Sequence, residues 1–242
     1  YQMKIAVVTG GTKGIGLQIV KDLLRRQYRV YTNYSSDGAA AQVAACEFAT
    51  ISPHFQIVKA DQSDNAAFAE FIQLVKSQET AVQCIVGNAG MTIRKAPMEF
   101  TNADWETMMQ VILNSHFYLV RDLRSLLTQD ARIVFIGSMM GILPHGTSLA
   151  YGVAKSALHS LAQNLVKEFE GTTTTVNVIA PGFVNTDWQS QKPQMIKDNI
   201  CNKTALHRFA TPEEITSAVA FCLDNPFVNG SIIEVNGGYC FK

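Results

Sequence analysis

The chain has 242 residues, a length that suits one domain built around a single large core. Hydrophobic residues make up 47% of the chain and charged residues 17%, which excludes a disordered protein or a coiled coil. Twenty basic residues balance twenty acidic ones, so no net field would attract nucleic acid or an anionic membrane. The five cysteines form no CxxC pair, and no apolar run is long enough to span a bilayer. We therefore expect reduced thiols, no metal site, no signal peptide and a cytoplasmic location.

Short apolar runs alternate with stretches of helical periodicity along the whole chain. The pattern predicts strands over residues 3–9, 29–33, 56–60, 82–86, 132–136, 175–179 and 231–235. It predicts helices over residues 17–27, 38–50, 65–77, 102–127 and 151–169, and a helix start after Pro212. Such alternation indicates an α/β fold, a Rossmann-type doubly wound parallel sheet with helices on both faces, in three α/β/α layers. Nothing divides residues 1–242 into more than a single domain.

A glycine-rich turn joins the first strand to the first helix. It reads Thr9-Gly10-Gly11-Thr12-Lys13-Gly14-Ile15-Gly16. Glycines let a phosphate approach the backbone, and the amino end of the following helix attracts negative charge. Because the turn stands between a strand and a helix, we expect it to bind the pyrophosphate of a dinucleotide.

Three polar residues follow the fifth strand. Tyr151 and Lys155 lie four residues apart, so they share one face of a helix, and Ser138 lies at the carboxyl end of the strand. Ligands bind at that edge of open α/β sheets. An ammonium group beside a phenol favours the phenolate, so we expect Lys155 to lower the pKa of Tyr151 into the range of acid–base catalysis.

These motifs, in this order, resemble those of the short-chain dehydrogenase/reductase family, and the resemblance covers essentially the whole chain. It adds Asn88-Ala89-Gly90 after the fourth strand and Pro181-Gly182 after the sixth. It implies an oxidoreductase in which Tyr151 protonates the substrate oxygen. Ser138 would hold that oxygen, and Lys155 would bind the nicotinamide ribose.

The segments around Pro181, Thr211 and Asn236 look most like those of bacterial 3-oxoacyl-[acyl-carrier-protein] reductases and acetoacetyl-CoA reductases. This implies NADPH-dependent reduction of a 3-oxoacyl thioester, as in fatty acid or polyhydroxyalkanoate metabolism. It also implies a homotetramer that uses the fourth and fifth helices. Val184 and Thr186 would meet the nicotinamide carboxamide, and residues of about 183–210 would form a lid over the substrate.

The end of the second strand bears on the choice of cofactor. An acidic residue there would hold the adenosine ribose and repel a 2′-phosphate. The chain instead has Asn33 and Ser35, with no carboxylate before Asp37, and Lys13 could reach the phosphate. We expect NADPH, with NADH held by Asp37 as the alternative. By resemblance, Asp61 and Gln62 would contact the adenine.

Two features depart from the family pattern. The family places an asparagine seven residues after a tryptophan, but the count from Trp105 reaches Ile112. We expect either weaker proton relay or a shifted helix register that turns Asn114 inward. The basic residues that would dock an acyl carrier protein are also absent from the ends of the fourth and fifth helices, which leaves coenzyme A thioesters open.

Two other functions remain open: reduction of a different small ketone, alcohol or sugar, and nucleotide binding with weak turnover. The five histidines lack the spacing of metal ligands, so we expect them at the surface or in helix packing. Only His145, between Ser138 and Tyr151, is a candidate for a substrate contact.

Overall fold

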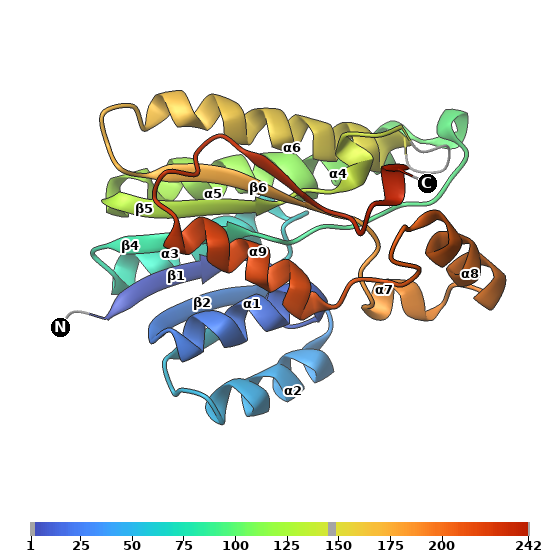
Figure 1. Ribbon diagram of the computed structural model, residues 1–242. Coiled ribbons are helices and arrows are strands. Elements are labelled where there is room, and N and C mark those ends of the chain that lie inside the picture. The colour runs from blue at the N-terminus through green and yellow to red at the C-terminus, as the bar shows by residue number, and fades with distance from the viewer. Residues whose placement is uncertain (1–2, 145–148, 242) are drawn as a thin grey trace.

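Seven parallel strands form the centre of the protein, which the computed structural model describes over residues 3–144 and 149–241 (Figure 1). The strands are β1 (Lys4–Val8), β2 (Tyr28–Tyr34), β3 (Phe55–Lys59), β4 (Val82–Gly87), β5 (Leu127–Ile136), β6 (Thr175–Pro181) and β7 (Ile232–Val235). Their order across the sheet is β3-β2-β1-β4-β5-β6-β7. The predicted doubly wound sheet is therefore confirmed. The order reverses between β1 and β4, where a cleft is expected outside the carboxyl ends.

Helices cover both faces of the sheet (Figure 1). One face carries α3 (Asn65–Gln78), α4 (Asn102–Met109), α5 (Ser115–Leu123) and α6 (Leu149–Glu168). The other face carries α1 (Gly14–Arg25), α2 (Gly38–Ala49) and α9 (Pro212–Asp224). Each face encloses its own apolar core, because strands buried on both sides present hydrophobic residues in both directions.

The helix predicted over residues 102–127 is wrong in one respect, because it is not continuous. A π-helical turn, η2 (Gln110–Asn114), separates α4 from α5, and a short 3₁₀ turn, η3 (Arg124–Leu126), ends the segment. Strand β5 begins directly afterwards at Leu127, earlier than predicted, since Leu127 pairs with Val82 of β4. A π-helical turn holds one residue more than an α-helical turn, and periodicity alone does not reveal it.

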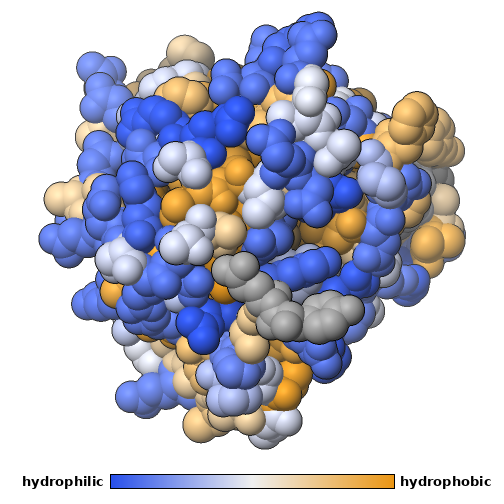
Figure 2. Space-filling view, turned by 90° about the vertical axis from the view of Figure 1, so that its left-hand side faces the viewer, coloured by the Kyte–Doolittle hydropathy of each residue, from blue (hydrophilic) through white to orange (hydrophobic). Residues whose placement is uncertain are grey.

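Two helices extend beyond the carboxyl edge of the sheet, α7 (Asp187–Ser190) and α8 (Gln194–Lys203) (Figure 1). The sequence pattern did not predict either of them. The opposite end of the molecule, where the strands begin, is mostly hydrophilic, and polar side chains separate its apolar groups (Figure 2). Within the described residues, no helix has the length and hydropathy needed to cross a membrane.

Candidate functional site

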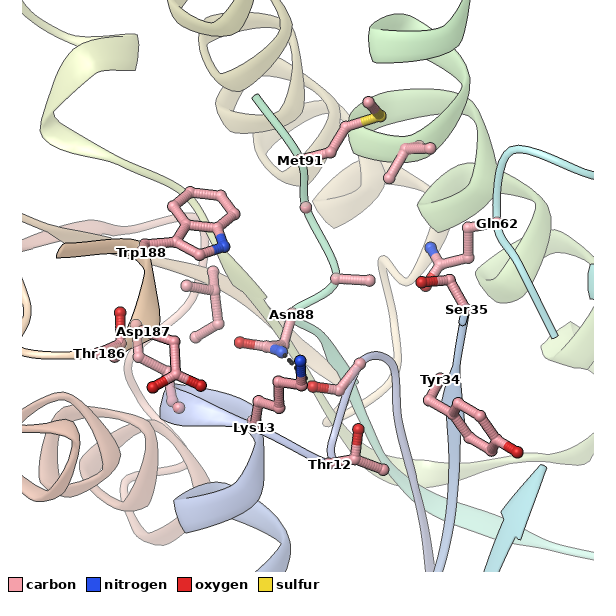
Figure 3. A pocket seen from close by; sticks show the side chains of 18 of the residues that line it. Thr12, Lys13, Tyr34, Ser35, Gln62, Asn88, Met91, Thr186, Asp187 and Trp188 are labelled. Carbon is pink, nitrogen blue, oxygen red and sulfur yellow. Dashed lines mark hydrogen bonds between the residues drawn. The ribbon is translucent and has the colours of Figure 1, made fainter. Parts of the chain in front are cut away.

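A cleft of about 510 Å³ opens at the carboxyl ends of the strands, where the sheet order reverses. Its volume lies in the usual range for sites that bind cofactors and small molecules. All the residues predicted for catalysis or cofactor binding line this one cleft, from Gly10 to Thr186. Figure 3 shows Trp188 and Gln62 on opposite sides of it, with Asn88 between them.

The glycine-rich turn leads from β1 into α1 along the floor of the cleft. Gly14 has a φ of +51°, which residues with a Cβ rarely adopt. A Cβ on Gly16 would lie 2.2 Å from the carbonyl oxygen of Gly10. These positions of the turn therefore require glycine, and the first residues of α1 line the cleft, where the amino end of a helix attracts a pyrophosphate.

Asparagine and threonine side chains hold this turn against the neighbouring strands. The Oγ1 of Thr9 accepts hydrogen bonds from the backbone N–H groups of Asn88 (2.9 Å) and Ala89 (3.0 Å). The Nδ2 of Asn88 in turn donates to the carbonyls of Thr9 and Gly10, each at 3.0 Å. Asn33 accepts from the N–H of Gly10 at 3.1 Å and is almost fully buried. Asn33 thus lines the cleft as a brace for the loop.

Ser138, Tyr151 and Lys155 meet at the end of β5. The hydroxyl groups of Ser138 and Tyr151 share a hydrogen bond. The Nζ of Lys155 lies 5.8 Å from the centre of the Tyr151 ring and donates to the carbonyl of Ile136 at 2.6 Å. A side-chain hydroxyl, a phenol and an amine therefore converge on one region of the cleft, next to the turn at Gly90.

The expected lowering of the tyrosine pKa is wrong for this arrangement. Burial raises the pKa of Tyr151 to about 12, and the hydrogen bond with Ser138 offsets only part of this effect. Burial also lowers the pKa of Lys155 to about 7, so the ammonium and the neutral amine are both populated at neutral pH. Tyr151 is consequently a neutral phenol at neutral pH, the form that can donate a proton.

The far end of the cleft suits an adenosine group. Buried Gln62 donates through Nε2 to the Oγ of Ser115 at 2.6 Å, but its Oε1 has no hydrogen-bond partner. A buried acceptor without a partner is costly, and an exocyclic amino group such as that of adenine would satisfy it. Lys13 forms an ion pair with Asp37 at this end, which places a cation beside the expected 2′-phosphate site. Together with the glycine turn, these residues fit a dinucleotide.

The substrate side of the cleft is more apolar. Trp188 of α7 packs edge-on against Tyr151, with ring centres 6.3 Å apart. Met91, Thr107 and Val111 also line the cleft. No sequence motif indicates Trp188, Thr107 or Val111 as residues of the site. Apolar residues that line a cleft follow no fixed spacing in the sequence. The position of Trp188 inside the predicted lid was therefore the only sequence feature that pointed to its place in the site.

The helix residue Ile112 does not enter the cleft. Its side chain is fully buried in the apolar core, whereas Val111 faces the cleft. Asn114 does not replace it, because its Nδ2 donates to the Oε1 of Gln110 at 3.3 Å. The register shift that would turn Asn114 inward is therefore not observed.

Two of the five histidines are buried close to the site. His159 accepts a hydrogen bond from the backbone N–H of Ser138 at 3.3 Å, and His116 contacts the carbonyl of Ile112. His145 lies outside the described residues. Across residues 3–144 and 149–241, no group of histidine, cysteine or carboxylate side chains could hold a metal ion.

Comparisons with known proteins agree with this geometry. The family model described as short chain dehydrogenase matches residues 4–197. A 3-oxoacyl-[acyl-carrier-protein] reductase of Aquifex aeolicus is 31% identical, over 98% of this chain and 97% of that protein. A short-chain dehydrogenase/reductase of Serratia marcescens superposes with a TM-score of 0.92 at 27% identity, covering 98% of both chains. The NADP active-site complex of Pseudomonas aeruginosa RhlG gives a TM-score of 0.87 at 30% identity, covering 98% of this chain and 96% of that one.

Proposed function

The chain belongs to the short-chain dehydrogenase family and is an oxidoreductase, and we propose that it reduces a 3-oxoacyl thioester to the 3-hydroxyacyl thioester with NADPH. One observation carries the proposal: Ser138, Tyr151 and Lys155 meet beside the glycine turn, in a cleft that fits a dinucleotide. The reductase of Aquifex aeolicus supports the thioester, and the RhlG complex supports NADP as the cofactor type.

In this proposal NADPH supplies the hydride to the carbonyl carbon. Tyr151 gives its phenolic proton to the substrate oxygen, and its raised pKa keeps that proton in place at neutral pH. The hydroxyl of Ser138, which already bonds to Tyr151, holds the same oxygen. Lys155 lies under the Tyr151 ring, and in its charged form it stabilises the phenolate left after the transfer. The segment 183–210 acts as the lid, with Trp188 facing Tyr151.

The carrier of the acyl group is proposed to be coenzyme A. An acyl carrier protein is acidic, so an enzyme that binds it needs an excess of positive charge on the surface where the carrier docks. Near the ends of α5 and α6, however, Arg124 is paired with Glu168, Arg121 with Asp122 and Lys167 with Glu170. Because each cation has a carboxylate beside it, this surface carries no excess of positive charge that would attract an acidic carrier. The packing of Trp188 on Tyr151 also favours a short substrate, which keeps other small ketones as the second candidate.

A direct assay tests the proposal. NADPH oxidation should be followed by absorbance with acetoacetyl-CoA as the substrate. We expect turnover by the native protein and its loss, by at least about 100-fold, in Tyr151→Phe, because a missing proton donor typically slows such reactions 10²–10⁴-fold. Tyr28→Phe, at the opposite end of the sheet, serves as the matched control.

The binding of NADPH to Tyr151→Phe should remain close to native, since only a hydroxyl is removed. Native-like turnover in Tyr151→Phe would disprove the assignment of the proton donor. Activity on a small ketone with none on acetoacetyl-CoA would reject the thioester as substrate and support the second candidate function, the reduction of another small ketone.

We also propose that the protein is a homotetramer. Phe117 of α5 and Leu149 and Val153 of α6 expose apolar surface on one helical layer, and Phe221 and Phe227 do so near β7. Two separate apolar surfaces fit the two kinds of twofold interface that a tetramer needs. Light scattering at micromolar concentration should give four times the chain mass of 26.6 kDa. Phe117→Glu should reduce this mass, and Met98→Glu, also exposed but outside both surfaces, should not. A monomeric native protein would contradict the proposal.

A further inference from the structure

A histidine connects the π-helical turn to the loop beneath the cofactor cleft. His116 is fully buried, and its ring lies over Gly87 at the end of β4 and edge-on to Phe135. Its Nδ1 is 2.8 Å from the carbonyl oxygen of Ile112 in η2. Its Nε2 is 3.4 Å from the Oγ1 of Thr9 at the end of β1. The ring therefore bridges two elements far apart in the sequence.

The chemistry of these contacts fixes the form of the imidazole. A carbonyl oxygen can only accept, so Nδ1 carries the hydrogen and donates it to Ile112. Burial, together with the charge of Lys155, lowers the pKa of His116 to about 3, so the ring is neutral and Nε2 keeps a free lone pair. The remaining contact then has one direction, in which the hydroxyl of Thr9 donates to Nε2.

All hydrogen-bonding positions of the Thr9 hydroxyl are thereby occupied. Its oxygen accepts from the backbone N–H groups of Asn88 and Ala89, and both of these partners are donors. The hydroxyl proton can therefore turn toward neither amide and needs an acceptor elsewhere. Among the described contacts, the Nε2 of His116 is that acceptor.

The π-helical turn anchors a second, parallel connection. The carbonyl of Val111, next to Ile112, accepts a hydrogen bond from the Oγ of Ser115. The same Oγ of Ser115 accepts a hydrogen bond from the Nε2 of Gln62, at the adenosine end of the cleft. The carbonyl of Val111 is thus connected through Ser115 to the adenosine end of the cleft. The neighbouring carbonyl of Ile112 is connected through His116 to Thr9, beneath the other end. A π-helical turn commonly accompanies a functional site.

We propose that His116 is a positioning residue for the nicotinamide cofactor. It fixes the Thr9 hydroxyl, and through it the Asn88–Gly90 turn against which the nicotinamide half of the cofactor would lie. It touches neither cofactor nor substrate. The proposal rests on the proposed nucleotide site but not on the identity of the substrate.

A double-mutant cycle on cofactor affinity tests this. His116→Phe keeps the ring and its packing on Phe135 but removes both nitrogens, and Thr9→Val keeps the branched shape but removes the hydroxyl. We expect each change to raise the dissociation constant of NADPH about 5- to 30-fold, with kcat at saturating NADPH changed roughly twofold or less. Since both variants break one chain of hydrogen bonds, the double variant should be no weaker than the worse single variant.

Two further measurements supplement the cycle, and the second uses only the native protein. His116→Gln can place an acceptor near the position of Nε2 and should bind NADPH better than His116→Phe or Thr9→Val. In the native protein, ¹⁵N NMR should show a neutral His116 protonated at Nδ1 from pH 5 to 8.

Four results would overturn the inference: an Nε2-protonated ring, a ring that titrates in that range, multiplicative effects in the cycle, or native affinity in a folded His116→Phe. If the native protein does not bind NADPH at all, the proposed function fails instead. That outcome is seen before any variant is compared.

Discussion

Lys13 and Asp37 stand as a pair at the adenosine end of the cleft, and their partnership bears on the choice of cofactor. Both side chains are nearly half exposed, so the pair itself contributes little to stability. Asp37 also accepts from the N–H of Ala40 as the cap of α2, which gives its carboxylate a fixed position. A bound 2′-phosphate can therefore draw Lys13 away from Asp37 without disturbing the helix.

This predicts a selective effect of Lys13→Ala. The dissociation constant of NADPH should rise about tenfold, the range of one charge-assisted hydrogen bond at an exposed site, while that of NADH should change roughly twofold or less. Lys21→Ala is the matched control, because Lys21 of α1 also pairs with a carboxylate but lies outside the cleft. Fluorescence titration of both cofactors gives the comparison. Equal weakening of NADPH and NADH would reject Lys13 as the phosphate ligand.

The effect of Ile112 on a proton relay stays a prediction, and the structure adds where its side chain lies. The sequence predicted that this position would affect a proton relay, but the side chain packs in the core. Only its carbonyl takes part in the polar network, and His116 donates to it. Substituting asparagine at position 112 would bury an amide among apolar residues, so it would destabilise the fold rather than improve catalysis.

At the scale of elements, the alternation of strands and helices was sufficient to predict the sheet and the cleft. Glycines at fixed positions and the Tyr151–Lys155 spacing report backbone and helix geometry directly, so they were readable from the sequence. The π-helical turn and helices α7 and α8 were not. Their form depends on tertiary contacts, such as His116 bonding to Thr9 or Trp188 packing on Tyr151, and no sequence period records such contacts.

Helix α7 yields a prediction about substrate size. Trp188→Ala would open the cleft beside Tyr151 and make room for a longer acyl chain. The ratio of kcat/KM for 3-oxohexanoyl-CoA to that for acetoacetyl-CoA should rise roughly tenfold, because two additional methylene groups would be buried at about 0.8 kcal/mol each. Met195→Ala, on α8 of the same lid but outside the cleft lining, should leave the ratio unchanged. A constant ratio in Trp188→Ala would show that the tryptophan does not limit chain length.

At the scale of the whole molecule, buried ionisable groups near the cleft link stability to pH. Burial lowers the pKa of His116 to about 3 and that of His159 to about 4, and the charge of Lys155 adds to both effects. In the unfolded chain these histidines bind protons below about pH 6.5, whereas in the folded chain both imidazoles stay neutral until the pH is much lower. The free energy of unfolding must therefore fall as the pH decreases from 6.5 toward 4.

The expected slope is up to about 1.4 kcal/mol per pH unit for each histidine once the pH is well below 6.5. The double variant His116→Phe/His159→Leu lacks both imidazoles, so its slope between pH 6 and 4.5 should be shallower than that of the native protein. Urea unfolding followed by circular dichroism at several pH values gives this slope. The slope is the informative quantity, because any packing defect in the variant shifts its stability equally at every pH. If the native and variant slopes coincide, the two histidines are not held neutral by burial. The hydrogen bonds from Thr9 to His116 and from Ser138 to His159 would then lack the neutral imidazole that both require as an acceptor.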